Sequence, residues 1–533
     1  MRNGLVWLSL VAMLRTQWGF GAQDGKQDKP ETLVRWHFAG TKQIAVSKEF
    51  KALREIVALP ESQAFRDSAV ATLAMKAGSH FTEAGSTNAN PAAVGLIKGL
   101  LPDLLQNESR VELSAKGTEN ASWILAIRLP QDRLESWSKN LVDLARLARM
   151  EVKGEAGSRT WSAGREDYHF AFAEQKEWVV LEGGFSKGPV DPKTFKEFRG
   201  GLGKKADKAI LDAQVNFPLL GAIWNSPQFS HYPKVSWRVL PHQDGVRSEG
   251  YIDYPQPLDI TPEKWNVPVD IIRDPLIGFT ALQGIRAKLG ESEGFKRLGA
   301  KKTPNQFFLW SQDNGPFAVF IAADVGNPED VVKTIGTKVL PGLKESPGGR
   351  IEISTNRSLV LWRGLPIVVP FFEQAADPDG SFLEAGLFPV ASTNKPPREL
   401  FEQLNRKNLV YYDWEITQAR LGQWRPIWQL ARMAQDKPFE GGASDPWLQA
   451  IAPKLGNTVT EATLEGANRL KFVRQSDSGF SALELVLLGR WLDGDQPARA
   501  PRPRAPQAQP TTGRPKRPTP APAARPVTGP PTQ

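Results

Sequence analysis

The sequence contains no cysteine, only six tyrosines and only five histidines among its 533 residues. Without cysteine the chain can form no disulfide bond, no thiolate nucleophile, no cysteine-ligated zinc or iron–sulfur site and no lipid-modified N-terminal cysteine. If the protein is exported, its stability must therefore come from packing. The 17 Trp and 26 Phe residues supply enough aromatic bulk for large cores.

A long apolar segment is also missing, because no run beyond the N-terminus reaches the roughly 18 residues of a membrane helix. The shorter apolar run from Gly4 to Leu14 follows Arg2 and has the length of a signal-peptide core. Small residues around Phe20 fit a cleavage site, so we expect residues 1–21 to be a signal peptide. This predicts a periplasmic or secreted protein whose mature chain has no transmembrane span. An uncleaved anchor or a false start is the alternative.

Acidic residues are absent from both ends of the chain. Residues 496–533 contain 12 prolines and seven basic residues, and the first 21 residues contain two more basic ones. Without these nine, Lys+Arg equals Asp+Glu at 58 each. A neutral body argues against a nucleic-acid partner, which requires clustered basic residues. We expect 495–533 to be a disordered, basic, Pro-rich tail that either contacts anionic envelope polymer or serves as a solvated spacer.

The body between the two ends repeats one order of patterns. Helical spacing dominates residues 50–104, and strand and helix patterns alternate after it. A similar succession of strands, helix and hairpin occupies 307–364. We therefore predict an α+β fold of two tandem modules, 30–262 and 263–494. Each would be a mainly antiparallel sheet, flat or curved, packed on amphipathic helices.

A weak internal match indicates that the second module duplicates the first. Residues 209–224 align with 410–424 at an offset of 201, which places Asp212 against Asp413. Residues 235–254 and 469–488 both have hairpin-like patterns, and the larger offset there requires an insertion near 433–457. Chance similarity is the alternative interpretation.

Two carboxylates lie within the aromatic run NLVYYDWEIT, and their pairing raises the question of catalysis. If 409–416 is a strand, Asp413 and Glu415 share one face, about 6.6 Å apart along it. That separation resembles the spacing in inverting glycosidases, but their acid and base flank the sugar from opposite sides. The competing interpretation is a half-buried strand with aromatic residues inside and acidic residues outside. An aspartate present in both copies would favour a turn, cap or salt-bridge role.

A second catalytic candidate is Ser186, in the G-x-S-x-G sequence GFSKG at 184–188. A nucleophile elbow needs a helix immediately after the serine. Here Pro189 and Pro192 follow closely, and no repeated parallel βαβ pattern surrounds the motif. An ordinary turn between a strand and a helix is therefore the favoured interpretation.

Nothing in the sequence indicates a metal or cofactor site. The histidines are scattered, without the H-E-x-x-H pattern or an i, i+4 pair, and no phosphate-binding loop is present. We therefore predict neither a metal nor a cofactor. The tryptophans could stack on glycans, but core filling is the default for those in strand-like runs. These residues are Trp123, Trp178, Trp237, Trp310 and Trp362.

The layout resembles a diffuse class of uncharacterised exported bacterial proteins with a signal peptide, two related α+β halves and a Pro-rich tail. The phrases RDPLIGFTALQGI and NLVYYDWEIT carry this resemblance. It covers most of the body, but it carries no functional residue and so implies no activity.

The sequence favours a non-enzymatic binding or structural role in the cell envelope. A curved sheet that closes over amphipathic helices could hold an apolar ligand, so a carrier of lipid or another hydrophobe is one version. The competing class is a hydrolase acting on envelope polymer or glycan. No catalytic residue is assigned beyond the candidates Asp413, Glu415 and Ser186.

Overall fold

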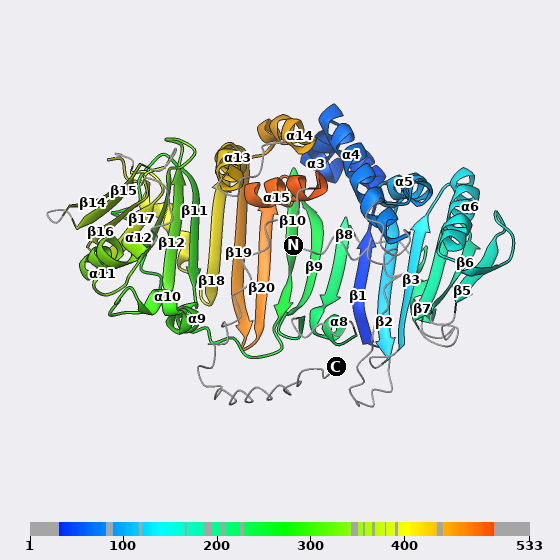
Figure 1. Ribbon diagram of the computed structural model, residues 1–533, viewed down its shortest axis with the longest axis horizontal. Coiled ribbons are helices and arrows are strands. Elements are labelled where there is room, and N and C mark those ends of the chain that lie inside the picture. Colours follow the sequence, from blue (N-terminus) through cyan, green and yellow to red (C-terminus); the bar gives the residue numbers. More distant parts are fainter. Residues whose placement is uncertain are drawn as a thin grey trace, which may run out of the picture. The chain divides into compact units, whose positions relative to one another are not determined.

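The computed structural model describes much of the chain between Glu31 and Gly494 (Figure 1). Within that span it does not describe residues 82–88, 117–119, 166–167, 186–194, 204–207, 224–228, 343–349, 355–357, 365–367, 379, 390–392 and 434–440. The predicted signal peptide, the basic tail and Ser186 therefore lie outside the described residues. The described residues belong to one compact unit and form an α+β fold, which confirms the predicted class.

Strands β1 to β10 come from the first predicted module and β11 to β20 from the second. The first set comprises β1 (Glu31–Phe38), β2 (Ser109–Lys116), β3 (Asn120–Arg128), β4 (Glu151–Lys153), β5 (Thr160–Arg165), β6 (Tyr168–Gln175), β7 (Trp178–Phe185), β8 (Leu211–Asn216), β9 (Lys234–His242) and β10 (Gly245–Asp253). The second comprises β11 (Leu276–Gln283), β12 (Gln306–Gln312), β13 (Val319–Ala323), β14 (Arg350–Ser354), β15 (Leu359–Arg363), β16 (Phe371–Asp377), β17 (Gly380–Gly386), β18 (Leu409–Ile416), β19 (Asn457–Gly466) and β20 (Arg469–Ser476).

All of these strands pair antiparallel in one continuous sheet, and β10 pairs with β20 at its middle. Outward from β10 the order is β9, β8, β1, β2, β3, β7, β6, β5 and β4. Outward from β20 it is β19, β18, β11, β12, β13, β17, β16, β15 and β14. Each first-half strand therefore has a counterpart numbered ten higher at the same distance from the centre.

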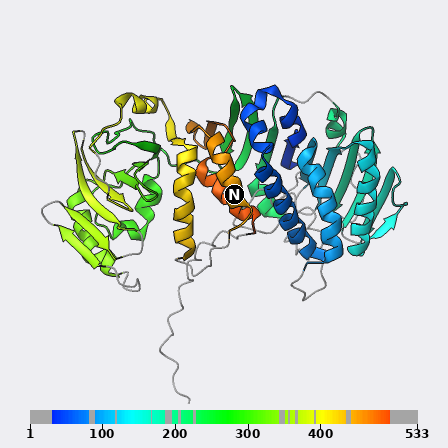
Figure 2. The same cartoon turned by 90° about the horizontal axis from the view of Figure 1, so that it is seen from above.

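Helices connect these strands and cover part of the sheet. In the first half they are α2 (Thr41–Val46), α3 (Lys51–Val57), α4 (Pro60–Gly78), α5 (Pro91–Gln106), α6 (Gln131–Leu147), α7 (Lys196–Gly201) and α8 (Phe217–Ile223). In the second they are α9 (Arg286–Glu291), α10 (Glu293–Lys296), α11 (Pro328–Thr334), α12 (Leu340–Gly342), α13 (Thr417–Met433), α14 (Ser444–Ile451) and α15 (Ala482–Leu492). Figure 2 shows α4, α5, α13 and α15 on the same face of the sheet.

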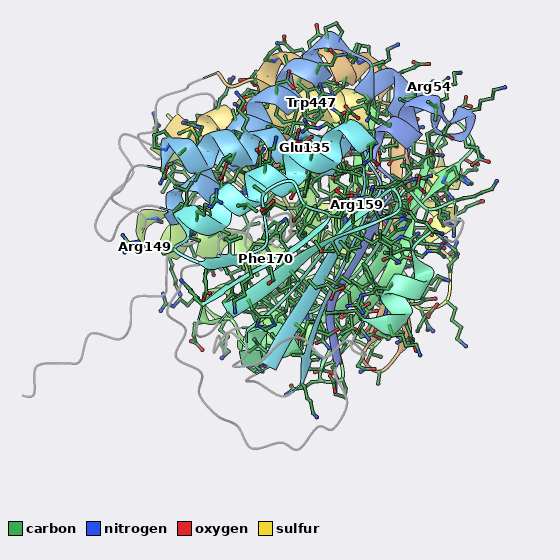
Figure 3. All side chains as sticks on the ribbon, turned by 90° about the vertical axis from the view of Figure 1, so that its right-hand side faces the viewer. Arg54, Glu135, Arg149, Arg159, Phe170 and Trp447 are labelled. Atoms are coloured by element: carbon green, nitrogen blue, oxygen red, sulfur yellow. The ribbon has the colours of Figure 1, made fainter. Side chains whose placement is uncertain are left out.

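The described residues pack into several cores rather than one. In the first half, Trp137 of α6 packs with Phe172 of β6, and Figure 3 shows α6, marked by Glu135, over the strand that carries Phe170. A separate cluster joins helices of both halves, where Phe65 of α4 stacks on Trp447 of α14 with ring centroids 4.3 Å apart. The two predicted modules thus share a helical core as well as a sheet.

The ends of the strands correct the alignment of the two halves. β8 ends at Asn216 and β18 at Ile416, and a helix begins at the next residue in both, so the offset is 200. The predicted offset of 201 is therefore wrong by one residue, and it is Ala213 that corresponds to Asp413. A slip of one residue in a strand moves every side chain to the opposite face.

The predicted hairpin at 469–488 is also wrong. Residues 469–476 form strand β20, which pairs with β19, and helix α15 begins at Ala482. The counterpart of the β9–β10 hairpin is therefore the β19–β20 hairpin. The connection from β18 to β19 spans 417–456, against 217–233 between β8 and β9, and contains α14 as an addition.

Candidate functional site

Asp413 and Glu415 lie side by side on the face of β18 that α13 and α15 cover. Glu415 is only 5% exposed, so the expectation that the acidic residues of this strand point outward is wrong for it. The two helices supply the cover, because α15 places its first turn directly over Glu415. The strand considered at 409–416 is present as β18, and helix α13 follows it directly.

Asp413 links its own strand to the neighbouring strand β11. Its Oδ1 accepts a hydrogen bond of 2.6 Å from the hydroxyl of Thr280, its register partner. Burial raises the pKa of the Asp413 carboxyl, while the Thr280 bond and the positive charges of Arg474 and Arg420 oppose that rise. The carboxyl is therefore poorly solvated, and its hydrogen bond to Thr280 links two strands.

Glu415 anchors the C-terminal helix α15 to the sheet. Its Oε1 accepts a hydrogen bond of 2.6 Å from the backbone N–H of Ala482, the first residue of α15. The first N–H groups of a helix have no partner within it, so a carboxylate there satisfies one of them. Burial raises the pKa of Glu415, and the Ala482 N–H counteracts this.

Two arginines and a third carboxylate complete this polar cluster. Arg474 of β20 donates to Thr460 on β19 at 2.8 Å and forms an ion pair with Glu484 of α15. Glu484 also closes a capping box with Ser481. Burial lowers the pKa of the Arg420 guanidinium on α13, and the nearby charges of Glu415 and Asp413 oppose that fall.

This arrangement favours a structural role over catalysis. Asp413 and Glu415 project from one face of one strand, so they cannot flank a substrate from opposite sides as a glycosidase pair does. Their hydrogen bonds to Thr280 and Ala482 hold a strand and a helix.

Asp212, which was predicted to match Asp413, lies on the opposite face of the sheet. It pairs with Arg238, its register partner on β9, at 3.3 Å and is half exposed. The two aspartates therefore have different roles. Asp413 accepts a hydrogen bond from β11 beneath the helices, whereas Asp212 forms an ion pair on the other face of the sheet. No repeated aspartate remains for a functional argument.

The histidines do not gather into a site within the described residues. His37 of β1 contacts Glu108 at 3.0 Å, and Glu108 also accepts from Arg110. No group of three metal-ligating side chains occurs in the described part of the chain, and no described helix is long and apolar enough to cross a membrane.

A feature that the motif search missed is an apolar strip on the helix-bearing face of the central strands. Residues directly opposite each other on neighbouring strands share a face, so the register traces the strip from β9 to β11. One row runs Trp237, Gly250, Phe472, Ala462, Tyr411 and Leu282, and the next runs Val235, Ile252, Leu470 and Leu464. We call these ten residues the apolar strip.

The large side chains of the apolar strip are half-buried, and none belongs to or packs against the hydrophobic clusters found among the described residues. Trp237 is among them: it is half-buried, and its ring meets that of Trp36 edge to face with centroids 6.3 Å apart. Figure 1 shows α15 crossing β20 and β10 near one end of these strands. In the sequences of β9 and β20, large apolar residues recur at every second position, and this alternation was the sequence signal for the strip.

Neither a protein-family model, nor a curated protein, nor a solved structure matches this chain.

Proposed function

We propose that this protein is an exported, non-enzymatic binding protein that holds an elongated apolar ligand along the apolar strip. The observation that supports this most directly is the continuity of the strip across six neighbouring strands without a charged side chain. Soluble proteins seldom expose a contiguous apolar patch unless something binds there. The buried, engaged carboxylates beside it give no support to the competing hydrolase.

The dimensions of the strip favour a chain-like ligand. The strip runs across six strands, from β9 to β11, and these are separated by five spacings of about 4.8 Å, so its length across the strands is about 24 Å. The two rows are two residues apart along each strand, or about 7 Å. A strip this long and narrow matches an extended lipid acyl chain better than a compact ring system.

Gly250 lies at the centre of the strip, where neighbouring residues approach the backbone of β10 closely. A Cβ atom at this position would lie 2.7 Å from the Cα of Trp237 and 2.9 Å from the ring of Phe472. The backbone of Trp237 and the ring of Phe472 therefore approach β10 from its two neighbouring strands. Aromatic side chains supply the largest apolar area per residue, so this pair would dominate the binding free energy.

A titration with a fluorescent fatty acyl probe tests this proposal on adjacent positions of one strand. Phe472 lies in the strip, and Val473 lies next to it on the opposite face with similar half-burial. Phe472→Asp should weaken probe binding about tenfold or more, because it places a charge in the apolar row; tenfold corresponds to about 1.4 kcal/mol. Val473→Asp should change the affinity less than about twofold. Equal effects of the two variants, or no binding by the natural chain, would refute the proposal.

A further inference from the structure

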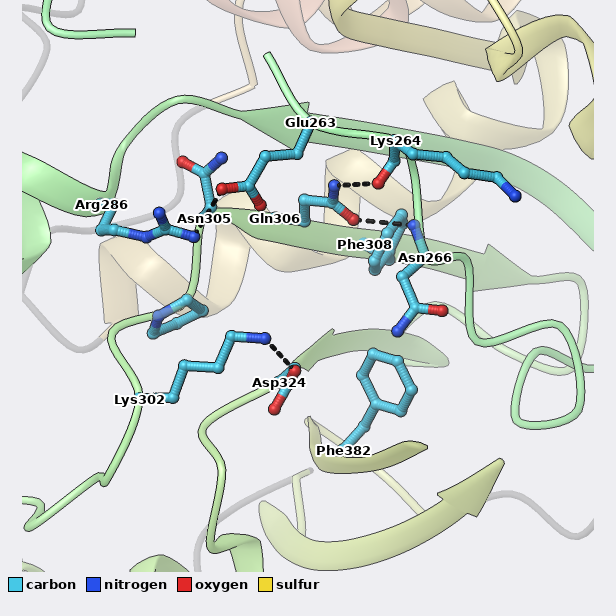
Figure 4. A pocket seen from close by; sticks show the side chains of 11 residues that line it. Glu263, Lys264, Asn266, Arg286, Lys302, Asn305, Gln306, Phe308, Asp324 and Phe382 are labelled. Carbon is cyan, nitrogen blue, oxygen red and sulfur yellow. Dashed lines mark hydrogen bonds and ion pairs between the residues drawn. The ribbon is translucent and has the colours of Figure 1, made fainter. Parts of the chain in front are cut away.

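The two halves of the chain have cavities at corresponding strand ends. In the first half, a cleft of about 950 Å³ lies where β1 and β3 end and where β2, β7 and β8 begin. In the second half, a pocket of about 80 Å³ lies where β13 ends and β12 begins (Figure 4). Asn107 lines the first cavity just before β2, and Asn305 lines the second just before β12. The charges of the two cavities can therefore be compared directly.

The second-half pocket neutralises its own charges. Figure 4 shows Arg286 paired with Glu263, at 2.8 Å, and Lys302 paired with Asp324. The side chain of Lys264 extends away from both pairs. A volume of about 80 Å³ has room for only a few water molecules. This pocket therefore offers a ligand little space and little charge.

The first-half cleft has more basic than acidic side chains in its lining. These are Lys42, Arg128, Lys176 and Lys208 against Glu49, Glu108 and Glu177. Each glutamate already contacts a basic side chain, in the pairs Glu49–Lys208 at 2.7 Å, Glu177–Arg128 at 2.9 Å and Glu108–Arg110 at 2.9 Å. The lining therefore retains positive charge that its own carboxylates do not neutralise.

Lys42 and Lys176 carry this excess positive charge. Lys42 donates to the uncharged Oδ1 of Asn107 at 3.1 Å, and an ammonium group has two further N–H donors. Neither lysine is paired with a carboxylate in the described part of the chain. Both side chains are exposed, so an anion that enters the cleft can reach them.

Lys176 occupies a turn position that favours glycine. Only Lys176 and Glu177 connect β6 to β7, and Lys176 has a φ of 58°. Left-handed positions in such two-residue hairpin loops favour Gly, Asn or Asp, because a larger side chain is strained there. The chain thus places a lysine beside the cleft at some cost in stability, which is consistent with a role in binding.

Buried apolar side chains line the same cleft. Phe50 is 4% exposed and Trp178 is 3% exposed, and Ile44, Leu129 and Ile210 are similarly buried. The volume of the cleft lies at the upper end of the roughly 300–1,000 Å³ that is typical of small-molecule sites. Lysines beside apolar walls suit a molecule that combines an anionic group with an apolar body.

We propose that the first-half cleft binds a small amphipathic anion. Its carboxylate or phosphate group would pair with Lys42 and Lys176, and its apolar body would pack against Phe50 and Trp178. The lining residues of the cleft include no member of the apolar strip, so this inference is independent of the proposed acyl ligand.

Isothermal titration calorimetry of the full chain with three compounds of one ring system tests the assignment. Naphthoate carries a carboxylate, naphthyl phosphate carries a phosphate, and naphthol is uncharged at neutral pH. At least one of the two anions should bind about tenfold more tightly than naphthol, or better, and the tighter anion identifies the preferred head group. If neither anion binds more tightly than naphthol, the assignment is wrong.

Charge-reversal variants locate the binding. Lys42→Glu and Lys176→Glu should each weaken binding of the tighter anion about tenfold or more, because each replaces attraction by repulsion. Lys116→Glu should change the affinity less than about twofold, because Lys116 ends β2 about 23 Å from that strand's first residue. Equal effects of Lys176→Glu and Lys116→Glu would overturn the assignment.

Lys176→Gly separates binding from stability. Glycine suits the φ of 58°, so the melting temperature should stay equal or rise, while anion binding should weaken about fivefold or more. Phe472→Asp, in the apolar strip, should leave anion binding unchanged. Undiminished binding by Lys176→Gly, or loss of anion binding in a folded Phe472→Asp, would count against the cleft as the site. Circular dichroism verifies that each variant is folded.

Discussion

At the scale of single residues, Glu384 shows how an acidic side chain can be buried beside the aromatic core of the second half. It lies on β17 directly opposite Glu373 of β16, on the face that also buries Phe382, and is 9% exposed. Burial, with a further contribution from the charge of Glu373, raises the pKa of Glu384 to about 8, whereas Arg273 lowers it. At neutral pH the side chain is therefore mainly protonated.

Because the pKa of Glu384 is raised in the folded chain, the free energy of unfolding decreases as the pH rises. The folded chain binds the Glu384 proton more tightly than the unfolded chain, so the free energy of unfolding should fall between about pH 4.5 and pH 8. Glu384→Gln should remove this contribution, which is at most about 5 kcal/mol. Denaturant unfolding at pH 5 and pH 9 measures this contribution, with the exposed Glu402→Gln as the control. If Glu384→Gln and the natural chain showed the same pH dependence of the free energy of unfolding, the predicted contribution of Glu384 would be ruled out.

At the scale of elements, helix α15 depends partly on contacts with residues distant in the sequence. Its capping box, Ser481 with Glu484, is a local signal that sequence inspection could have found at 481–484. The hairpin interpretation overlooked it because the apolar residues after Ser481 fit either period over a short stretch. The bond from Ala482 to Glu415 joins residues 67 positions apart, and no local pattern predicts it.

We expect the hydrogen bond from the Ala482 N–H to the Glu415 carboxylate to contribute measurably to the free energy of unfolding. Glu415→Ala leaves the Ala482 N–H without this partner, whereas Glu415→Gln keeps an oxygen in place. Alanine should cost about 1–2 kcal/mol more than glutamine in the free energy of unfolding. Glu461→Ala, which removes an ion pair with Arg406 on the opposite face, should cost less than about 1 kcal/mol. Equal stability of the Ala and Gln variants would show that the bond contributes nothing.

The element-scale predictions succeeded where a pattern was long and failed where it was short. The 409–433 strand and helix and the helix starting at Pro91 were predictable from period and caps. The predicted equivalence of Asp212 and Asp413 was wrong because two short strand sequences fix their alignment only to within one residue, and a shift of one residue moves the side chain to the opposite face. The apolar strip as a whole was unpredictable because its residues come from six strands spread between Val235 and Phe472.

At the scale of the whole described chain, the counterpart order of the strands leads us to infer a tandem duplication. Independent sequences would have no reason to give the same ten-strand order on both sides of the β10–β20 pair. The halves then diverged on one face, which is aromatic under β11–β13 and charged under β1–β3. The pairing of β10 with β20 and the shared helical core bind the two halves together.

The centre of the sheet should be intolerant of any side chain at Gly250. A Cβ atom there would lie 2.0 Å from the Ser236 carbonyl oxygen, a backbone contact that cannot be relieved by rotating a side chain. Gly250→Ala should therefore lower the free energy of unfolding by about 1–3 kcal/mol. Gly95→Ala in α5 meets nothing within 4 Å and should raise it by about 0.5–1 kcal/mol. Chemical denaturation of both variants checks the contrast, and a neutral Gly250→Ala would be inconsistent with this geometry.

Native mass spectrometry of the intact chain tests the central claim most directly, because it detects any apolar molecule retained on the protein. After incubation with a mixed lipid extract, the natural chain and Val473→Asp should both carry adducts with the masses of acyl-chain lipids. Phe472→Asp should carry these lipid adducts at a level at least tenfold lower. A natural chain without such adducts, or equal adduct levels on Phe472→Asp, would contradict the assignment of the strip as a ligand site.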